Sequence, residues 1–188
     1  MNMTPLFLAS TGFKFIDWQK LWAILLKYWD KFLIEGVKYT LLISAITVFF
    51  GAILAAALAL MKMSKILPLR WLSAIYVEVI RGTPMLLQLY FFYFGLPMLI
   101  PALNKQKLLC ICIALICNSA AYVSEVIRSG IQAVDPGQTE AALSLGFNKK
   151  QTMWYIVLPQ AVKNILPALG NEFIMIVKDT SLASTFFV

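Results

Sequence analysis

Residues 39–61 read YTLLISAITVFFGAILAAALALM, a run without a single charged side chain. A helix needs about 20 mostly apolar residues to cross the hydrocarbon core of a bilayer, so this stretch predicts a membrane span. The composition agrees, because 61% of the 188 residues are hydrophobic and only 13% are charged. Soluble domains are about half apolar and about a quarter charged. We therefore expect an all-α, polytopic helical membrane protein.

Three further apolar regions follow the first span. By length and hydropathy we place them at about 71–100, 108–127 and 165–188. A polar stretch, 135–159, separates the third from the fourth. The fourth region is the weakest by hydropathy, since it contains several charged side chains.

Ionisable side chains within these spans are candidates for function, because such groups are costly in hydrocarbon and face a bundle interior, a wet cavity or a partner charge. Two acid–base pairs have the three-residue spacing that lets side chains meet on one helix face. They are Glu78 with Arg81 and Glu125 with Arg128. We expect structural ion pairs or an inner gate from them. The fourth span adds Glu172, Lys178 and Asp179, candidates for a pathway wall that structural pairing explains as well.

Residues 1–35 form a separate N-terminal segment that contains KLWAILLKYWDKFLI and is too charged to span a bilayer. At about 100° per residue, Lys20, Lys27 and Lys31 share one narrow helix face. This pattern is typical of a helix that lies in the lipid interface, and a helix packed on the protein's own flank explains it equally well. The segment lacks the compact apolar core and small-residue cleavage site of a signal peptide.

Several classes of protein are excluded by what the chain lacks. It contains no histidine and no GxxxxGK[ST] phosphate loop, so it has neither the commonest general base nor its own ATP site. Cys110, Cys112 and Cys117 match no metal-site spacing. We expect no catalytic residues, cofactor or metal. The net charge of +7 comes from lysines scattered between apolar spans, which indicates membrane flanks and no nucleic acid. Cations on the two sides of the spans balance, so charge bias leaves the orientation open.

The polar stretch 135–159 reads DPGQTEAALSLGFNKKQTMWYIVLP. Asp135 can cap a helix whose first position is Pro136, with Gln138 as the partner in a capping box. Gly146 supplies a stop, because glycine tolerates the left-handed conformation at a helix end.

The second half of this stretch starts another helix. Asn148 and Gln151 repeat the start signal, and Pro159 disfavours unbroken continuation of that helix. By local chemistry alone the stretch is two short helices joined at a glycine between two membrane spans.

Seven residues of this stretch, by type and spacing, resemble the EAA loop of ABC importer permeases. They are Glu140, Ala141, Ala142, Gly146, Ile156, Leu158 and Pro159. The resemblance implies a type I ABC importer transmembrane domain over residues 36–188. It also implies that the loop is cytoplasmic and that its first helix docks on a separate ATPase subunit.

Other segments resemble the polar amino-acid uptake branch of that family. They are Arg81-Gly82-Thr83-Pro84 with Gln88, Tyr93 to Pro97, Ala121-Tyr122 with Glu125 and Arg128, and Lys178 to Leu182. The resemblance implies a permease subunit, not an enzyme, in the bacterial cytoplasmic (inner) membrane. Its implied partners are an ATPase, a second identical or homologous permease, an extracytoplasmic amino-acid-binding protein and a polar amino acid. Permeases of this branch usually have five spans, so we expect that the last helix is missing.

Two other function classes are less consistent with the sequence. A membrane-embedded enzyme needs a nucleophile–base pair or a metal cluster, and the sequence offers neither. A channel or secondary transporter without an ATPase partner needs more spans or an internal repeat. Binding of an ATPase subunit would separate the importer from both.

Overall fold

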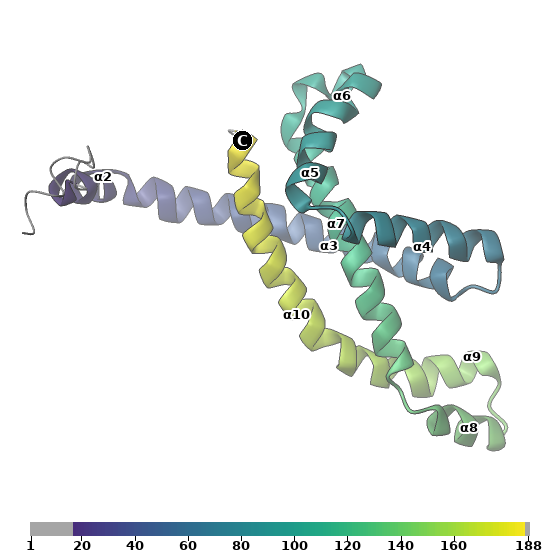
Figure 1. Cartoon of the computed structure of the whole chain (residues 1–188). Helices are drawn as coiled ribbons and strands as arrows, with labels where there is room; N and C mark the ends of the chain where they lie inside the picture. The colour runs from purple at the N-terminus through teal and green to yellow at the C-terminus, as the bar shows by residue number, and fades with distance from the viewer. Residues whose placement is uncertain (1–16, 187–188) are drawn as a thin grey trace, which may run out of the picture. The chain divides into compact units, whose positions relative to one another are not determined.

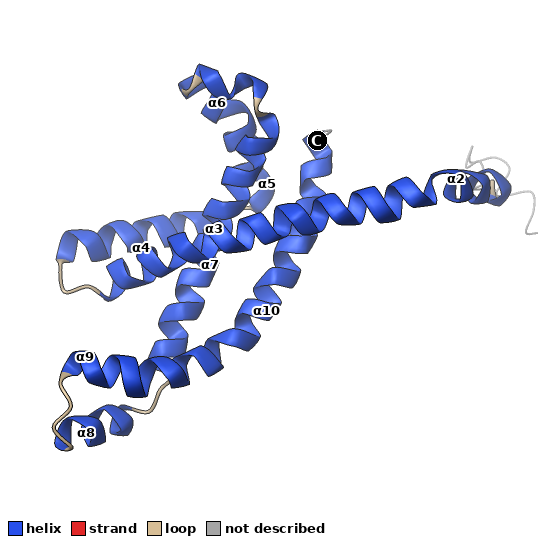
Figure 2. Ribbon diagram, turned by 180° about the vertical axis from the view of Figure 1, so that it is seen from behind, coloured by secondary structure: helices blue, strands red, loops and turns tan. Residues whose placement is uncertain are grey.

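The computed structural model describes residues 17–186, apart from the side chain of Phe32. Residues 1–16 of the predicted N-terminal segment and residues 187–188 of the predicted fourth span lie outside this range. The chain forms two compact units, Met1–Tyr39 and Thr40–Val188. Figure 2 shows helices and connecting loops, and no strand, throughout the described range.

The described part of the first unit is helical. Asp17 caps α2 (Trp18–Asp30), since its carboxylate accepts a hydrogen bond from the backbone N–H of Lys20 at 3.3 Å. A π-helical turn, η1 (Lys31–Gly36), leads from α2 into α3 (Val37–Met63). No residue of α2 is buried within the chain. The expected N-terminal helix is therefore present, and its position at a lipid surface stays a prediction.

Two helices in the described range are long and apolar enough to cross a membrane, Leu33–Met63 and Lys107–Gln132. They contain the predicted first and third spans. An apolar helix at Met85–Leu99 is shorter. The predicted fourth span falls in α10 (Leu158–Ala183), whose four charged side chains lower its hydropathy. The number of spans therefore stays a prediction.

The predicted second span, 71–100, is wrong as a single helix. The structure has α4 (Leu67–Arg81), a break at residues 82–84, and then α5 (Met85–Tyr90). Pro84 causes the break, because proline has no backbone N–H and disfavours the helical conformation in the residue before it. Figure 1 shows α5 leaving the line of α4 at this point.

The helical path continues from α5 through the π-helical turn η2 (Phe91–Gly95) and α6 (Leu96–Leu99). A short 3₁₀ helix, η3 (Pro101–Lys105), then connects to α7 (Lys107–Gln132). Pro101 therefore lies at the turn into α7.

Two other prolines, Pro97 and Pro159, do not interrupt their helices, and for Pro159 this differs from the expected end of the helix. The N–H of Leu96, just before Pro97, bonds to the carbonyl of Phe91 five residues back. In the same way the N–H of Leu158, just before Pro159, bonds to Met153. Such π-helical turns widen the backbone, which relieves the clash between a proline ring and the carbonyl four residues earlier. The helical path therefore continues through both Pro97 and Pro159.

Helix α7 is the centre of the second unit and packs most extensively against α10. Its N-terminal half joins a cluster with Leu89 of α5 and Phe186, and its middle joins a cluster with Ala55 and Leu58 of α3. Near its C-terminal end, α7 meets α10 at Gly130, which is buried. A Cβ atom at position 130 would lie 2.3 Å from Cγ1 of Ile165. Only glycine therefore permits this approach of the two helices.

We expect Gly130→Ala to lower the stability of the protein by about 1–3 kcal/mol, the usual effect of overpacking. Gly170→Ala is the matched control, because nothing lies within 4 Å of a Cβ atom there and both glycines lie in helices. The measurement is thermal unfolding of the purified protein in detergent. Ile165→Ala should restore part of the loss in the Gly130→Ala background. Equal melting temperatures for the two single variants would contradict the close contact.

Candidate functional site

The loop between α7 and α10 begins with α8 (Pro136–Ser144). Asp135 caps it as predicted, and its Oδ1 accepts a hydrogen bond from the N–H of Gly137 at 2.7 Å. The predicted capping box does not form as expected. Gln138 contributes its backbone N–H, which bonds to the carbonyl of Asp135 at 3.0 Å, and no hydrogen bond of its side chain is found in the described range. The short Asp135 side chain reaches the N–H at the second position of the helix, that of Gly137. The N–H at the third position, that of Gln138, bonds to the backbone carbonyl instead.

Helix α8 ends at Gly146, whose φ is +87°. The N–H of Gly146 bonds to the carbonyl of Leu143 at 3.0 Å, and the N–H of Phe147 bonds to the carbonyl of Ala142 at 3.1 Å. This pair of bonds is the Schellman motif, which requires a left-handed residue at the glycine position. Since nothing lies within 4 Å of a Cβ atom at position 146, the glycine is needed for its backbone conformation and not for space. The predicted stop is confirmed.

The next helix, α9 (Lys149–Thr152), starts with the predicted capping box. Asn148 Oδ1 accepts from the N–H of Gln151, and Gln151 Oε1 accepts from the N–H of Asn148, both at 2.9 Å. The π-helical turn η4 (Met153–Val157) joins α9 to α10 without a break. One helical path therefore runs from the loop to Ala183, and Figure 1 shows α8 and α9 at the far end of α7 and α10.

The seven residues that resemble the EAA loop divide into two groups. Ala142 is buried, and Ile156 and Leu158 are half-buried, so these three hold the loop against its neighbours. The remaining members are exposed, namely Glu140, Ala141, Gly146 and Pro159. The structure adds Leu145, which sequence reasoning missed and which is 80% exposed beside them. An apolar side chain within a polar loop was the available signal, since such exposure is typical of a contact surface.

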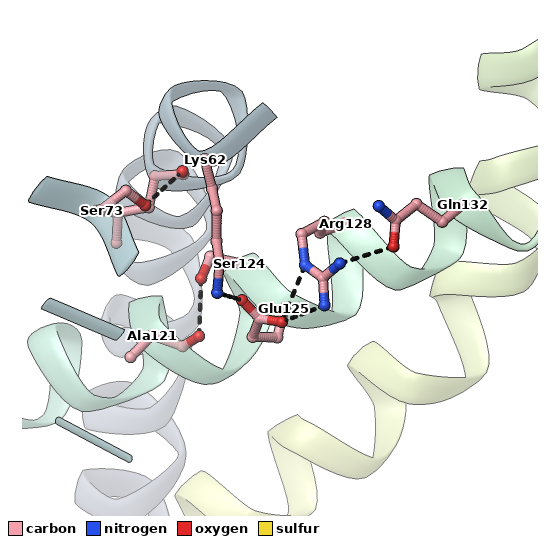
Figure 3. Close-up of polar contacts among 8 residues, drawn as sticks. Lys62, Ser73, Ala121, Ser124, Glu125, Arg128 and Gln132 are labelled. Carbon is pink, nitrogen blue, oxygen red and sulfur yellow. Dashed lines mark hydrogen bonds and ion pairs between the residues drawn. The ribbon is translucent and has the colours of Figure 1, made fainter. Parts of the chain in front are cut away.

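A second group of polar residues joins the end of α3 to α7. Glu125 bonds through Oε1 to Nζ of Lys62, and through Oε2 to Nη2 and Nε of Arg128 at 2.7 and 3.0 Å. Arg128 Nη1 donates to Gln132 Oε1 at 2.7 Å. Figure 3 shows these side chains in one chain of contacts. The predicted pairing of Glu125 with Arg128 is confirmed. Lys62 was missed, because its partner lies 63 residues away in the sequence.

The predicted pairing of Glu78 with Arg81 is wrong. In the described range no ion pair joins them. The Arg81 guanidinium instead lies 5.3 Å from the centre of the Tyr122 ring on α7, an attractive cation–π arrangement. The break after Arg81 explains the difference, because the residue sits at the end of α4 where a neighbouring helix is within reach.

A pocket of about 160 Å³ lies beside this arginine contact, between the α4–α5 break, α7 and α10. Glu172 and Asp179 both face it, and they are seven residues apart on one face of α10. Lys178 is exposed and does not line it. The remaining lining residues are Thr83, Met85, Asn118, Tyr122 and Met175. Two of the three residues predicted for a pathway wall are therefore brought together, and the third is not.

The pocket and its surroundings offer groups that suit the two charges of a small zwitterion. The carboxylates that line the pocket can accept hydrogen bonds from an ammonium group. The Arg81 guanidinium does not line the pocket, but it lies over the ring of the lining residue Tyr122 and offers donors for a carboxylate. In the described range, no group of three or more His, Cys, Asp or Glu side chains is placed to hold a metal ion.

The chain is similar to known proteins over most of its length. Residues 48–188 match a family model described as binding-protein-dependent transport system inner membrane component. The arginine transport system permease protein ArtQ of Bacillus subtilis is 44% identical over 153 residues, 81% of this chain and 69% of that protein. The L-cystine transport system permease protein TcyB of the same organism is 39% identical over 167 residues, 89% of this chain and 70% of that protein.

The fold is also similar to a solved structure. A crystal structure of an amino acid ABC transporter with histidines superposes with a TM-score of 0.79 at 45% sequence identity. The match covers 88% of this chain and 76% of that chain.

We expect Glu125→Ala to destabilise the protein by roughly 2 kcal/mol, because it leaves Lys62 and Arg128 half-buried without their shared partner. Glu78→Ala is the matched control, since Glu78 is exposed and forms no ion pair within the described range. Thermal unfolding in detergent measures both. An unchanged melting temperature for Glu125→Ala would show that the contact contributes little to stability.

Proposed function

The chain belongs to the family of binding-protein-dependent transport system inner membrane components, and we propose that it is the permease subunit of an ABC importer that carries a polar amino acid across the bacterial cytoplasmic membrane. The observation that carries this proposal is the unbroken helical path from the α8–α9 loop to the pocket. The same helix, α10, emerges from the loop at one end and presents Glu172 and Asp179 to the pocket farther along.

The loop is the proposed docking site for a separate ATPase subunit in the cytoplasm. Its exposed members include Glu140, Ala141 and Leu145. Small alanine side chains let a partner surface approach the helix closely, and the Glu140 carboxylate is available to a partner cation. ATP hydrolysis belongs to that partner, so this chain is proposed to bind no cofactor of its own. Movement of α8 would then reach the pocket through the short connection at 145–148 and along the continuous helical path of α9, η4 and α10.

The pocket is the proposed site where the amino acid passes. The backbone ammonium group of the amino acid suits the side chains of Glu172 and Asp179. Its backbone carboxylate suits the guanidinium of Arg81 beside the pocket. The two relatives named above are called permeases for arginine and for L-cystine, so the side chain of the substrate stays open. The Lys62–Glu125–Arg128 contacts are proposed to hold the C-terminal end of α3 against α7, as a structural ion-pair group or as part of an inner gate.

The remaining parts of the assembly are proposals of the same kind. They are a second permease copy or a homologous permease, an extracytoplasmic amino-acid-binding protein, and a multi-pass domain over residues 36–188 with the loop inside. The N-terminal segment is proposed to lie against lipid through the exposed tryptophans of α2. ATP-dependent uptake of labelled amino acids by the complete transporter in proteoliposomes tests the proposal as a whole. Equal uptake without ATP or without the ATPase would favour a channel or secondary transporter.

We expect Gly146→Val to uncouple ATP hydrolysis from uptake, because a β-branched residue is strained at a φ of +87°. The distorted loop should then lose most of its ATPase binding while the membrane domain stays folded. Gly146→Asn is the matched control, since asparagine tolerates this conformation better. Co-purification of the ATPase and uptake per ATP hydrolysed are the measurements. Wild-type coupling in Gly146→Val would count against the docking role.

We expect Glu172→Gln and Asp179→Asn each to reduce uptake at least tenfold, since each removes a charge that faces the ammonium group of the substrate. Lys178→Gln, which changes a neighbouring charge outside the pocket, should leave uptake within about twofold, well below the tenfold step of one lost charged hydrogen bond. Initial rates of labelled amino-acid uptake at equal amounts of reconstituted transporter provide the comparison. If Lys178→Gln lost more uptake activity than both pocket variants, the pocket would not be the substrate site.

A further inference from the structure

The break between α4 and α5 leaves backbone carbonyls without their helical partners. In a continuous helix the carbonyl of Ile80 would accept from the N–H of residue 84, but that residue is Pro84 and has none. The side-chain amide of Gln88 takes this place, together with longer bonds that Thr83 donates to the same carbonyl from its N–H at 3.4 Å and from Oγ1 at 3.2 Å. Gln88 Nε2 lies 2.7 Å from the carbonyl oxygen of Ile80, 3.1 Å from that of Thr83 and 2.9 Å from Thr83 Oγ1. Gln88 is only 5% exposed, so water does not compete for these bonds.

These contacts determine which way the Gln88 amide points. Backbone carbonyls can only accept hydrogen bonds, so the NH₂ group must face them and Oε1 must face away. Gln88 Oε1 lies 3.0 Å from Nδ2 of Asn118 on α7. Because Oε1 is an acceptor, the Asn118 side that faces it must be the NH₂ group. The orientation of one amide therefore determines the orientation of the other.

The consequence appears in the pocket. Asn118 is 8% exposed and lines the pocket with Glu172 and Asp179. With its NH₂ group held by Gln88, its Oδ1 is the polar atom left for a ligand, and no hydrogen bond to Oδ1 is found within the described residues. The carbonyl oxygen thus adds a third acceptor, which remains for the side chain of the substrate when the two carboxylates bind its backbone ammonium. A reversed amide would present a donor instead and would favour a ligand that carries acceptors.

We propose that Gln88 is a positioning residue that holds the Asn118 amide with its oxygen toward the pocket, and thereby selects ligands that present N–H donors there. This inference rests on the proposed function, because it takes the pocket as the amino-acid site. Gln88 itself touches no ligand. Its NH₂ group bonds to the carbonyls at the Pro84 break, and its Oε1 therefore accepts from Asn118 on α7 and sets the orientation of the Asn118 amide.

Equilibrium binding of labelled arginine and labelled glutamate to the purified permease–ATPase complex in nanodiscs tests the proposal. These two probes carry a donor-rich and an acceptor-rich side chain. In Gln88→Met, which keeps the length but has no polar group able to orient Asn118, the ratio of arginine to glutamate affinity should fall about tenfold. That change is the size expected for one hydrogen bond to a charged group.

Two further variants separate positioning from general stability. Gln88→Glu should keep most of the wild-type ratio, because a buried carboxyl in its neutral form still donates to a carbonyl and still accepts from Asn118. In the Asn118→Ala background, Gln88→Met should change the ratio by less than about twofold, a small part of the tenfold step expected for one charged hydrogen bond, since the group that it positions is gone.

The outcomes distinguish this inference from the function beneath it. Wild-type complex that binds neither probe, nor glutamine as a neutral third probe, would overturn the amino-acid pocket and this inference with it. Wild-type binding with an unchanged ratio in Gln88→Met would overturn the role of Gln88 alone. That role is also overturned if Gln88→Met lowers the ratio equally with and without Asn118, or if Gln88→Glu behaves like Gln88→Met.

Discussion

The absence of a backbone N–H at proline is the constraint on which this architecture depends. In a chain surrounded by hydrocarbon, a carbonyl that loses its helical donor must find another partner inside the protein. At Pro84 the helix breaks, and the Gln88 side chain replaces the missing donor. At Pro97 and Pro159 the helix instead widens into a π-helical turn and continues. A further proline, Pro167, lies inside α10, and Figure 1 shows that the helical path curves between α9 and the end of α10.

The different solutions at Pro84 and Pro159 have different consequences for function. The break after Arg81 turns α5 away from α4, places Thr83 at the wall of a pocket and brings the guanidinium onto Tyr122. At Pro159 the helix stays continuous, and this continuity joins the exposed α8–α9 loop to the helix that carries Glu172 and Asp179. A continuous helical path between an exposed loop and a polar pocket suits the proposed coupling of the permease to a separate ATPase.

Close helix contacts hold this arrangement together. Gly130 lets α7 and α10 approach until a single added carbon would collide with Ile165, and Glu125 ties the end of α3 to α7 through Lys62. Membrane helices gain little from excluding water from each other, so close packing and polar contacts of this kind supply much of their association. The match to permeases over most of the chain is in keeping with a bundle assembled in this way.

Local chemistry in the sequence was sufficient for features in which a few neighbouring residues decide the outcome. The uncharged run 39–61 identified a helix long and apolar enough to cross a membrane. Asp135 and Asn148 identified helix starts and Gly146 identified a helix end, since each depends on backbone groups within a few residues. The tertiary structure alone decided the contacts between distant segments. Glu125 binds Lys62 as well as its helical neighbour, Arg81 leaves Glu78 for Tyr122, and Glu172 and Asp179 share a pocket with Asn118 while Lys178 does not. Spacing along a helix tells which side chains share a face, but which neighbouring helix that face meets is set by packing across the whole bundle.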